Sequence, residues 1–216
     1  MTYYLIHKKY GEDKMKIILV KHGKCESSIQ KIIAGHSDTP LTEVGRKQAK
    51  SLAGDFLKNG IKFDAVYSWD TLRASETTNI ICEILGINDV VYDKRLREYN
   101  VGIFTGRKIS SLTKEEKDFL NNTLIDLNLK TPGGESDKKM TVCVKEAFFE
   151  IINNHPEAST ILLIGHGGTL NHILVRILNL LPSKLEERFE PCIMNILERK
   201  SKDEVWNLTR FNNNEL

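Results

Sequence analysis

The sequence has little of several features on which special classes of protein depend. Its four cysteines are spread over 216 residues without a C-x-x-C pair, which argues against a metal or disulfide framework and favours a reducing cytoplasm. Proline and glycine number only 5 and 14, which excludes collagen-like and low-complexity chains. No apolar run reaches the roughly 18 residues of a membrane-spanning helix, so we expect no membrane partner.

Neither sign of charge dominates the composition. Lysine and arginine number 31 against 29 aspartates and glutamates, a net charge of +2. This balance gives no reason to expect nucleic acid as a partner. The length fits one domain at about 150 residues per domain, with room for an inserted segment.

The chain divides into an expected extension, one domain and a tail. Residues 1–15 are interrupted by charges and hold no apolar signal segment, so we expect an N-terminal extension. Residues 16–211 form the expected domain, and the asparagine-rich residues 212–216 are expected to fray. Residues 102–139 are polar and contain Pro132-Gly133-Gly134, so we interpret them as a small cap insertion.

Short aliphatic runs alternate with longer amphipathic segments. We expect buried strands at Lys16–Val20, Phe63–Trp69, Val90–Tyr92 and Ser159–Gly165, and helices at Leu41–Leu57, Thr71–Leu85, Thr113–Leu127, from Glu135 onward and at Leu170–Leu181. This alternation predicts an α/β fold of three layers, α/β/α, with a mostly parallel central sheet.

Two segments near the C-terminus alternate in polarity and predict antiparallel edge strands. They are Ile193–Arg199 and Asp203–Phe211. Pairing of such edges between two copies would form a homodimer, which the sequence leaves open.

Two of the buried strands run directly into a His-Gly pair. His22-Gly23 follows the first strand, and His166-Gly167 follows the strand that ends at Gly165. Because ligands of open parallel sheets bind beyond the carboxyl ends of the strands, both histidines are expected at one edge. One such pair can be a mere strand end, but two after aliphatic strands favour a common site. Gly167 opens a helix whose free N–H groups suit an anion.

Two further charged residues are expected at the same edge. Arg73 falls in the first turn of the helix after the Phe63–Trp69 strand, where a cation adds to the attraction of the helix N-terminus for anions. Glu98 follows the Val90–Tyr92 strand and is a candidate proton donor. Each alone is more typical of a surface salt bridge or a solvated charge.

These motifs together resemble the histidine phosphatase, or phosphoglycerate mutase-like, superfamily, and its short phosphatase-type branch. The family pattern R-H-G-E-T-x-x-N is represented by residues 21–28, and the pattern Q-G-x-x-D-x-P-L-T-x-x-G-x-x-Q-A by residues 34–49. Ser68 to Thr77 fits its S-x-x-x-R-A-x-x-T, and Glu98 with Gly102 and Gly106 its spaced glycines. Residues 133–136 and 166–168 fit the remaining signatures.

The resemblance implies a phosphoryl-transfer mechanism. His22 would attack phosphorus and form a phosphohistidine, while Glu98 would protonate the departing alcohol and later accept a proton from water. His166 would act with Arg73 and Lys21 on the phosphoryl oxygens. With these cations in place, no metal or other cofactor is expected.

The resemblance also assigns residues around the phosphate and the leaving group. Ser28 and Gly167 would complete the phosphate site. The leaving group would lie near Lys24, Gly35, His36, Glu135 and Ser136. The alternative is that the Gly133-Gly134 pair serves only as the turn before a helix.

Three residues depart from the family pattern around the expected pocket. Lys21 stands for arginine and lacks the two parallel donors of a guanidinium group. Ser28 stands for asparagine, and Lys24 for glutamate. Lys24 would either support phosphate binding, recognise a second anionic group or face water.

Three functions therefore compete. The first is a phosphomonoester hydrolase acting on a small phosphorylated metabolite, favoured by the short region after Glu98. The second is a mutase of the same fold. The third is a weakly active or inactive phosphate-binding regulator, which the replacement of arginine by Lys21 motivates.

Overall fold

The computed structural model describes residues 14–180, 189–212 and 214–215. The expected extension therefore lies outside the described residues up to position 13. The described elements run in the order β1 (Met15–Lys21), α1 (Glu26–Ile29), α2 (Glu43–Lys58), β2 (Ala65–Ser68), α3 (Leu72–Leu85), β3 (Val90–Tyr92), η1 (Lys94–Leu96), η2 (Gly102–Phe104), η3 (Ile109–Ser111), α4 (Lys114–Thr123), α5 (Asp137–Asn153), β4 (Thr160–Gly165), α6 (Gly167–Asn171), η4 (His172–Ile177), β5 (Met194–Arg199), β6 (Asn207–Phe211) and β7 (Asn214–Glu215).

The strands form one seven-stranded sheet in the order β3-β2-β4-β1-β5-β6-β7. The first four strands of this order are parallel, and β5, β6 and β7 continue the sheet in antiparallel fashion. In the pairing of β1 with β4, Lys21 lies opposite Gly165. The residues that follow these two positions are therefore placed side by side at the carboxyl edge of the parallel strands.

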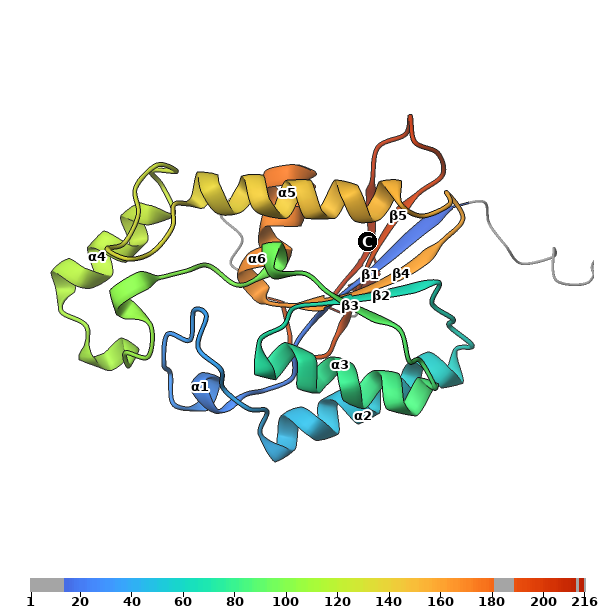
Figure 1. Ribbon diagram of the computed structural model, residues 1–216, viewed down its shortest axis with the longest axis horizontal. Coiled ribbons are helices and arrows are strands. Elements are labelled where there is room, and N and C mark those ends of the chain that lie inside the picture. The colour runs from blue at the N-terminus through green and yellow to red at the C-terminus, as the bar shows by residue number, and fades with distance from the viewer. Residues whose placement is uncertain (1–13, 181–188, 213, 216) are drawn as a thin grey trace, which may run out of the picture.

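Helices cover both faces of the sheet and give the three layers predicted from sequence. Figure 1 shows α2 and α3 on one face, and α5 with α6 on the other. Along β1, Ile17 and Leu19 pack into the core beneath α5, while Ile18 and Val20 pack against α2 and α3. Burial on both faces explains why this strand is continuously aliphatic rather than alternating.

The first strand begins one residue earlier than predicted. Met15 is only 1% exposed and pairs with Arg199 of β5, so it belongs to the sheet and not to the extension. Its apolar side chain joins the core beneath α5. The polarity of the preceding residues hid this boundary from the sequence pattern.

The helices around the sheet begin and end at recognisable signals. The hydroxyl of Thr42 accepts the N–H of Gly45 at 3.0 Å and caps α2. Gly86, with φ of 68°, ends α3 in the left-handed conformation. The helix expected from Glu135 begins at Asp137, because Ser136 is its N-cap and accepts from the N–H of Lys139.

The segment 102–139 contains η2, η3 and α4 and leads into α5. Figure 1 shows α4 beyond the end of the helical layers, near the first turn of α5. Helix α4 starts where predicted, with a capping box between Thr113 and Glu116, but it ends at Thr123 rather than Leu127. The shorter helix reflects a turn in which the N–H groups of Leu124 and Ile125 bond the carbonyls of Asn121 and Asn122.

The last part of the chain differs from prediction in several places. The strands expected at Ile193–Arg199 and Asp203–Phe211 begin at Met194 and Asn207. The helix expected at Leu170–Leu181 starts at Gly167 and turns π-helical from His172 to Ile177; position 181 lies outside the described residues. The expected tail is not all frayed, because Asn214–Glu215 forms β7 and pairs with Arg210 and Phe211 of β6. An ion pair of Arg210 with Glu215, at 3.2 Å, supports this pairing.

No helix within the described residues is both long and apolar enough to cross a membrane.

Candidate active site

The two His-Gly pairs meet at the carboxyl edge of β1 and β4. The rings of His22 and His166 lie edge to face, with centroids 5.0 Å apart and an interplanar angle of 69°. The N–H of His22 donates to the carbonyl of Gly165 at 2.8 Å, which extends the parallel pairing to the last residue before His166. The topology therefore brings together two imidazoles separated by most of the chain.

His22 is held in one tautomer. Its Nδ1 lies 2.8 Å from the carbonyl oxygen of Gly23, and because a carbonyl only accepts, Nδ1 carries the proton. The lone pair is then on Nε2. Burial, followed by the charge of Arg73, lowers the pKa of His22 to about 3. The imidazole is therefore neutral near pH 7 and has a nucleophilic nitrogen.

Gly23 has no room for a side chain. A Cβ at this position would lie 2.6 Å from the carbonyl oxygen of Gly45. The N–H of Gly23 donates to the hydroxyl of Thr77 on α3, at 3.0 Å. These contacts fix the turn that follows β1, and with it the acceptor of the His22 ring.

His166 is fully buried and has one ring nitrogen without a partner among the described residues. Its Nε2 lies 2.8 Å from the hydroxyl of Thr71, whereas Nδ1 has no hydrogen-bond partner. Burial and the charge of Arg73 hold the pKa of His166 well below its usual range. If the Thr71 hydroxyl donates to Nε2, the neutral ring carries its proton on Nδ1 and can donate it to a bound anion.

Arg73 lies in the first turn of α3 and is 2% exposed. Its Nη1 donates to the carbonyl of Ser37 at 2.8 Å, and its Nη2 to that of Gly35 at 2.9 Å. These bonds hold the loop after α1 against the site. A guanidinium has five N–H donors, so these two contacts leave donors for an anion in the cavity that Arg73 lines.

Glu98 is held by two backbone donors. Its Oε1 accepts the N–H of Tyr99 at 2.9 Å, and its Oε2 accepts the N–H of Gly168 at 3.2 Å. A Cβ at Gly168 would lie 2.1 Å from Oε1, so only glycine permits this approach. The carbonyl of Glu98 is 2.6 Å from Nε2 of His36. Glu98 is thus fixed on both sides, and its carboxylate lines the same cavity as the histidines.

A cavity of about 400 Å³ joins these side chains. The residues that line it are Lys21, His22, Cys25, Ser27, Ser28, Ile32, Ile33, Ala34, Gly35, Arg73, Glu98, Tyr99, Val101 and His166. Charged and imidazole side chains gather around His22, whereas Ile32, Ile33, Ala34 and Val101 supply an apolar part. This size fits a phosphate ester of a small alcohol.

The three departures from the family pattern occupy different positions. Lys21 lines the cavity, and its Nζ donates to the carbonyl of Phe189 at 2.9 Å. Ser28 also lines it, but its hydroxyl donates to the carbonyl of Cys25 at 2.6 Å and accepts the N–H of Cys25 at 3.2 Å. Lys24 is exposed and is not one of the lining residues. Of the three, Lys21 is the one placed beside His22 as a cation.

Four other residues named from sequence are not among the residues that line the cavity. Gly167 starts α6, and a Cβ there would be 3.8 Å from the Lys21 side chain. His36 contacts Glu98 from behind through the carbonyl already described. Glu135 accepts the N–H of Asn100 at 2.9 Å, and Ser136 caps α5.

Several residues at or near the site were not anticipated from sequence. Thr71 orients His166, and Cys25 lines the cavity at 2% exposure. His172 is buried, and its Nε2 lies 3.1 Å from Oδ2 of Asp137. The position of His172 four residues after Gly168 was the available signal, because residues four apart share a face of a helix.

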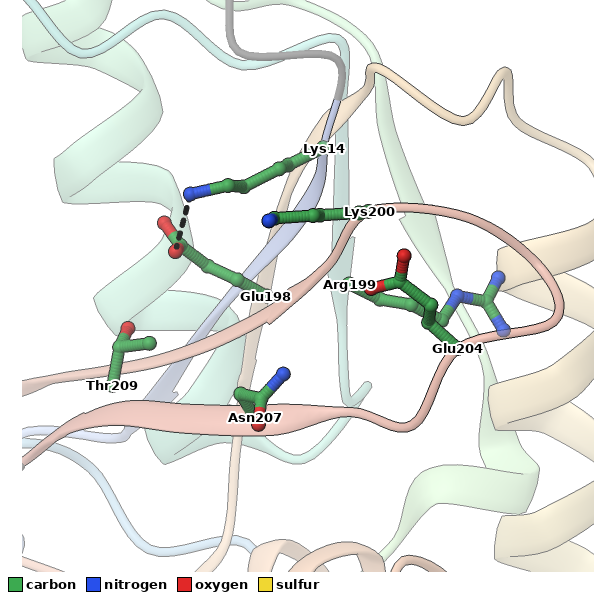
Figure 2. Close-up of a pocket in the computed structure, with 7 residues that line it drawn as sticks. All are labelled: Lys14, Glu198, Arg199, Lys200, Glu204, Asn207 and Thr209. Carbon is green, nitrogen blue, oxygen red and sulfur yellow. Dashed lines mark ion pairs between the residues drawn. The ribbon is translucent and has the colours of Figure 1, made fainter.

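A second cavity, of about 260 Å³, lies near the opposite edge of the sheet, where β1 begins and β5 ends. Figure 2 shows Lys14 and Lys200 pointing toward Glu198. Glu198 pairs with Lys14 at 3.7 Å and with Lys16 at 3.1 Å. The seven residues that line this second cavity include neither histidine nor cysteine. This cavity therefore has none of the nucleophiles found at the other edge.

Comparison with known proteins places this arrangement in a family. Residues 17–214 match the model of the histidine phosphatase superfamily, branch 1. The chain is 33% identical over 195 residues to a probable phosphoglycerate mutase, GpmB, of Escherichia coli O1:K1, covering 89% of this chain and 87% of that protein.

Solved structures share the fold at lower identity. A mycobacterial glucosyl-3-phosphoglycerate phosphatase superposes with a TM-score of 0.79 at 22% identity, covering 92% of this chain and 99% of the other. A putative α-ribazole-5′-P phosphatase of Escherichia coli K-12 gives 0.77 at 22% identity, covering 92% and 96%.

Proposed function

This chain belongs to the histidine phosphatase superfamily, and we propose that it is a phosphomonoesterase that hydrolyses small phosphorylated metabolites through a phosphohistidine on His22. One observation carries the proposal. In the part of the chain that the structure describes, one cavity is lined by His22, a neutral imidazole with a lone pair on Nε2, by a second imidazole whose Nδ1 has no partner, and by the acidic residue Glu98. These groups are what nucleophilic phosphoryl transfer needs.

The first step is displacement at phosphorus. Nε2 of His22 forms the bond to phosphorus as the bond from phosphorus to the ester oxygen breaks. Glu98 supplies a proton to that oxygen, so the leaving group departs as a neutral alcohol. The Gly23 carbonyl stabilises the positive charge that develops on the His22 ring, because it accepts the hydrogen bond of Nδ1.

The phosphoryl oxygens are stabilised by charge and by preorganised donors. Arg73 is held by two carbonyls, Nζ of Lys21 donates to the Phe189 carbonyl, and Nδ1 of His166 has no partner within the described residues. Because these groups are already oriented and shielded from water, they lose little by reorganisation during the reaction. Ser28 contributes less than the family asparagine would, since its hydroxyl proton is already donated to Cys25.

The second step regenerates the enzyme. Water attacks the phosphohistidine, Glu98 accepts a proton from this water, and the bond from phosphorus to Nε2 breaks. Inorganic phosphate leaves, and His22 returns to the neutral tautomer that its Gly23 contact favours.

Similarity to a probable phosphoglycerate mutase supports a second candidate, transfer between positions of phosphoglycerate. A mutase must hold a bisphosphorylated acid, with two phosphates and a carboxylate. The lysine and arginine of the described lining, Lys21 and Arg73, both act on His22. The remaining lining includes Ile32, Ile33 and Val101, which favours hydrolysis of an ester with a less charged alcohol.

A panel of phosphorylated metabolites, read by phosphate release, tests the proposal. We expect steady phosphate release with wild type, loss of turnover in His22→Ala, and unchanged turnover in His155→Ala. The last is the matched control, because the imidazole that it removes bonds the hydroxyl of Tyr67. Chelation by EDTA should leave the rate unchanged. Ligand binding that survives in His22→Ala, without turnover in wild type, would identify a phosphate-binding regulator. Transfer to phosphoglycerate that depends on a bisphosphorylated primer would identify a mutase.

A further inference from the structure

A buried ion pair contacts Gly168, the residue whose N–H donates to Glu98. His172 begins the π-helical segment η4 and is 9% exposed, and Asp137, the first residue of α5, is 2% exposed. Nε2 of His172 lies 3.1 Å from Oδ2 of Asp137, and Nδ1 lies 2.9 Å from the carbonyl oxygen of Gly168. Both ring nitrogens therefore face acceptors.

Such an environment requires the protonated ring. A neutral imidazole carries one N–H, so one of its two nitrogens would face an acceptor with a lone pair. An imidazolium donates to both. Burial opposes the charge, but the hydrogen bonds to Asp137 and Gly168 raise the pKa of His172 above its usual value. Burial likewise opposes ionisation of Asp137, and the bond from His172 lowers its pKa.

Gly168 connects this ion pair to the catalytic carboxylate. The N–H of Gly168 donates to Glu98, while its carbonyl accepts from the ring of His172. Glycine is needed at this position for the close approach of Glu98, but glycine also has the freest backbone. The imidazolium restricts that freedom by binding the carbonyl side of the residue whose N–H side binds Glu98.

We propose that His172 and Asp137 are positioning residues for proton transfer by Glu98, acting through Gly168. The proposal rests on the proposed function, in which Glu98 protonates the leaving alcohol. Loss of the ion pair frees Gly168, and Glu98 then spends less time where its proton reaches the ester oxygen. The π-helical turn that starts at His172 fits this role, because such turns are frequent at functional sites.

The charges that face His172 come from three parts of the chain. Asp137 approaches from α5, and Glu98 from the loop after η1. Arg176, from η4 itself, lies with Nε 3.5 Å from Oδ1 of Asp137. Thr141 donates to the carbonyl of Asp137 at 2.9 Å. The carboxylate of Asp137 thus contacts two cations. Its removal affects His172 most, because the His172 ring is hydrogen-bonded directly to this carboxylate.

The dependence on the leaving group separates this role from a general structural one. An alkyl phosphate needs a proton on its departing alcohol, whereas p-nitrophenyl phosphate releases a stable anion. We expect Asp137→Asn to lower kcat/KM for an alkyl phosphate by on the order of 10- to 100-fold and to change that for p-nitrophenyl phosphate little. His172→Gln, which keeps a single amide in place of two ring donors, should do the same. Glu116→Gln breaks an ion pair with Arg107 in the cap and is the matched control.

A double-mutant cycle identifies Glu98 as the residue acted upon. In Glu98→Gln, kcat/KM for the alkyl substrate should fall by about 10²- to 10⁴-fold. Adding Asp137→Asn to this variant should lower kcat/KM little further. Equal losses for both substrates, or no loss in either Asp137→Asn or His172→Gln, would overturn the positioning role. A Glu98→Gln enzyme without leaving-group dependence would instead overturn the proposed function of Glu98.

Wild type provides a readout that needs no folded variant. The ratio of kcat/KM for the alkyl substrate to that for p-nitrophenyl phosphate should fall with rising pH where the ¹⁵N signals of the His172 ring titrate. A ratio that stays constant through this titration would contradict the proposal.

Discussion

Acidification should destabilise this protein through its buried nucleophile. Burial and the charge of Arg73 lower the pKa of His22 to about 3 in the folded protein, against about 6.5 for an unperturbed histidine. As pH falls below 6.5, the unfolded chain binds a proton that folded His22 does not. Stability from this residue is therefore fully present above about pH 6.5 and is lost as pH falls toward 3. Between pH 7 and pH 5 the linkage amounts to about 2 kcal/mol.

This window separates the histidine from the carboxylates. Unfolded carboxyl groups titrate near pH 4, so they contribute little above pH 5. His172 acts with opposite sign, because its pKa is raised and its contribution is lost as pH rises. His166 has the same sign as His22. A variant at position 22 therefore isolates one contribution while the other two remain.

The assay is urea unfolding of wild type and His22→Gln at pH 7 and pH 5. The variant should lose about 2 kcal/mol less than wild type on going from pH 7 to pH 5. The difference between the two pH values is the measured quantity, so a constant change in stability caused by glutamine cancels. If both proteins lose the same amount, His22 is not held neutral by the fold, and the argument for its nucleophilic state fails.

Three further outcomes test the geometry of the site. Gly168→Ala introduces a Cβ that would lie 2.1 Å from Oε1 of Glu98, so it should lower kcat/KM for an alkyl phosphate by about 10²-fold or more. Turnover at the wild-type rate would show that Glu98 has room to move. Lys21→Arg should raise kcat/KM several-fold, to about tenfold at most, because a guanidinium can bind the Phe189 carbonyl and still present paired donors to phosphate. An unchanged or lower kcat/KM would mean that the pocket is adapted to lysine. Burial opposes ionisation of Cys25, but hydrogen bonds from Ser27 and Ser28 lower its pKa. We therefore expect iodoacetamide to inactivate the enzyme at neutral pH, orthovanadate to slow the inactivation, and Cys25→Thr to resist it. Inactivation of Cys25→Thr at the wild-type rate would assign the effect to another thiol.

The residues whose position depends on strand ends were predictable from the sequence. Aliphatic runs identify β1 and β4, and the rule that parallel strands present their carboxyl ends at one edge then places His22 near His166. Arg73 follows from the same logic, since it lies in the first turn after β2. These placements depend on short-range pattern and on topology, both of which the sequence carries.

Residues whose position depends on how a loop folds back were not predictable. Glu135 and Ser136 are expected beside the leaving group, and this stays a prediction; what the sequence did not indicate is that Ser136 accepts the N–H of Lys139 and Glu135 that of Asn100. Spacing along the chain says nothing about such local competition for side-chain oxygens. The partnership of His172 with Asp137 was missed for a related reason, because it joins two helices whose relative packing the sequence pattern does not specify.

The position of Glu98 bears on whether this protein catalyses or only binds. A protein that merely retains phosphate gains from cations and loses from a carboxylate at the same cavity, because like charges repel more strongly where water is scarce. Here the carboxylate is held by two backbone N–H groups, and one of these belongs to a glycine that no larger residue could replace without a clash. Such placement of a carboxylate would weaken phosphate binding, and the proton transfer proposed for Glu98 would account for it. On the proposed mechanism, Lys21 in place of arginine alters the strength of phosphate binding, while the placement of Glu98 keeps the proton transfer that hydrolysis would need.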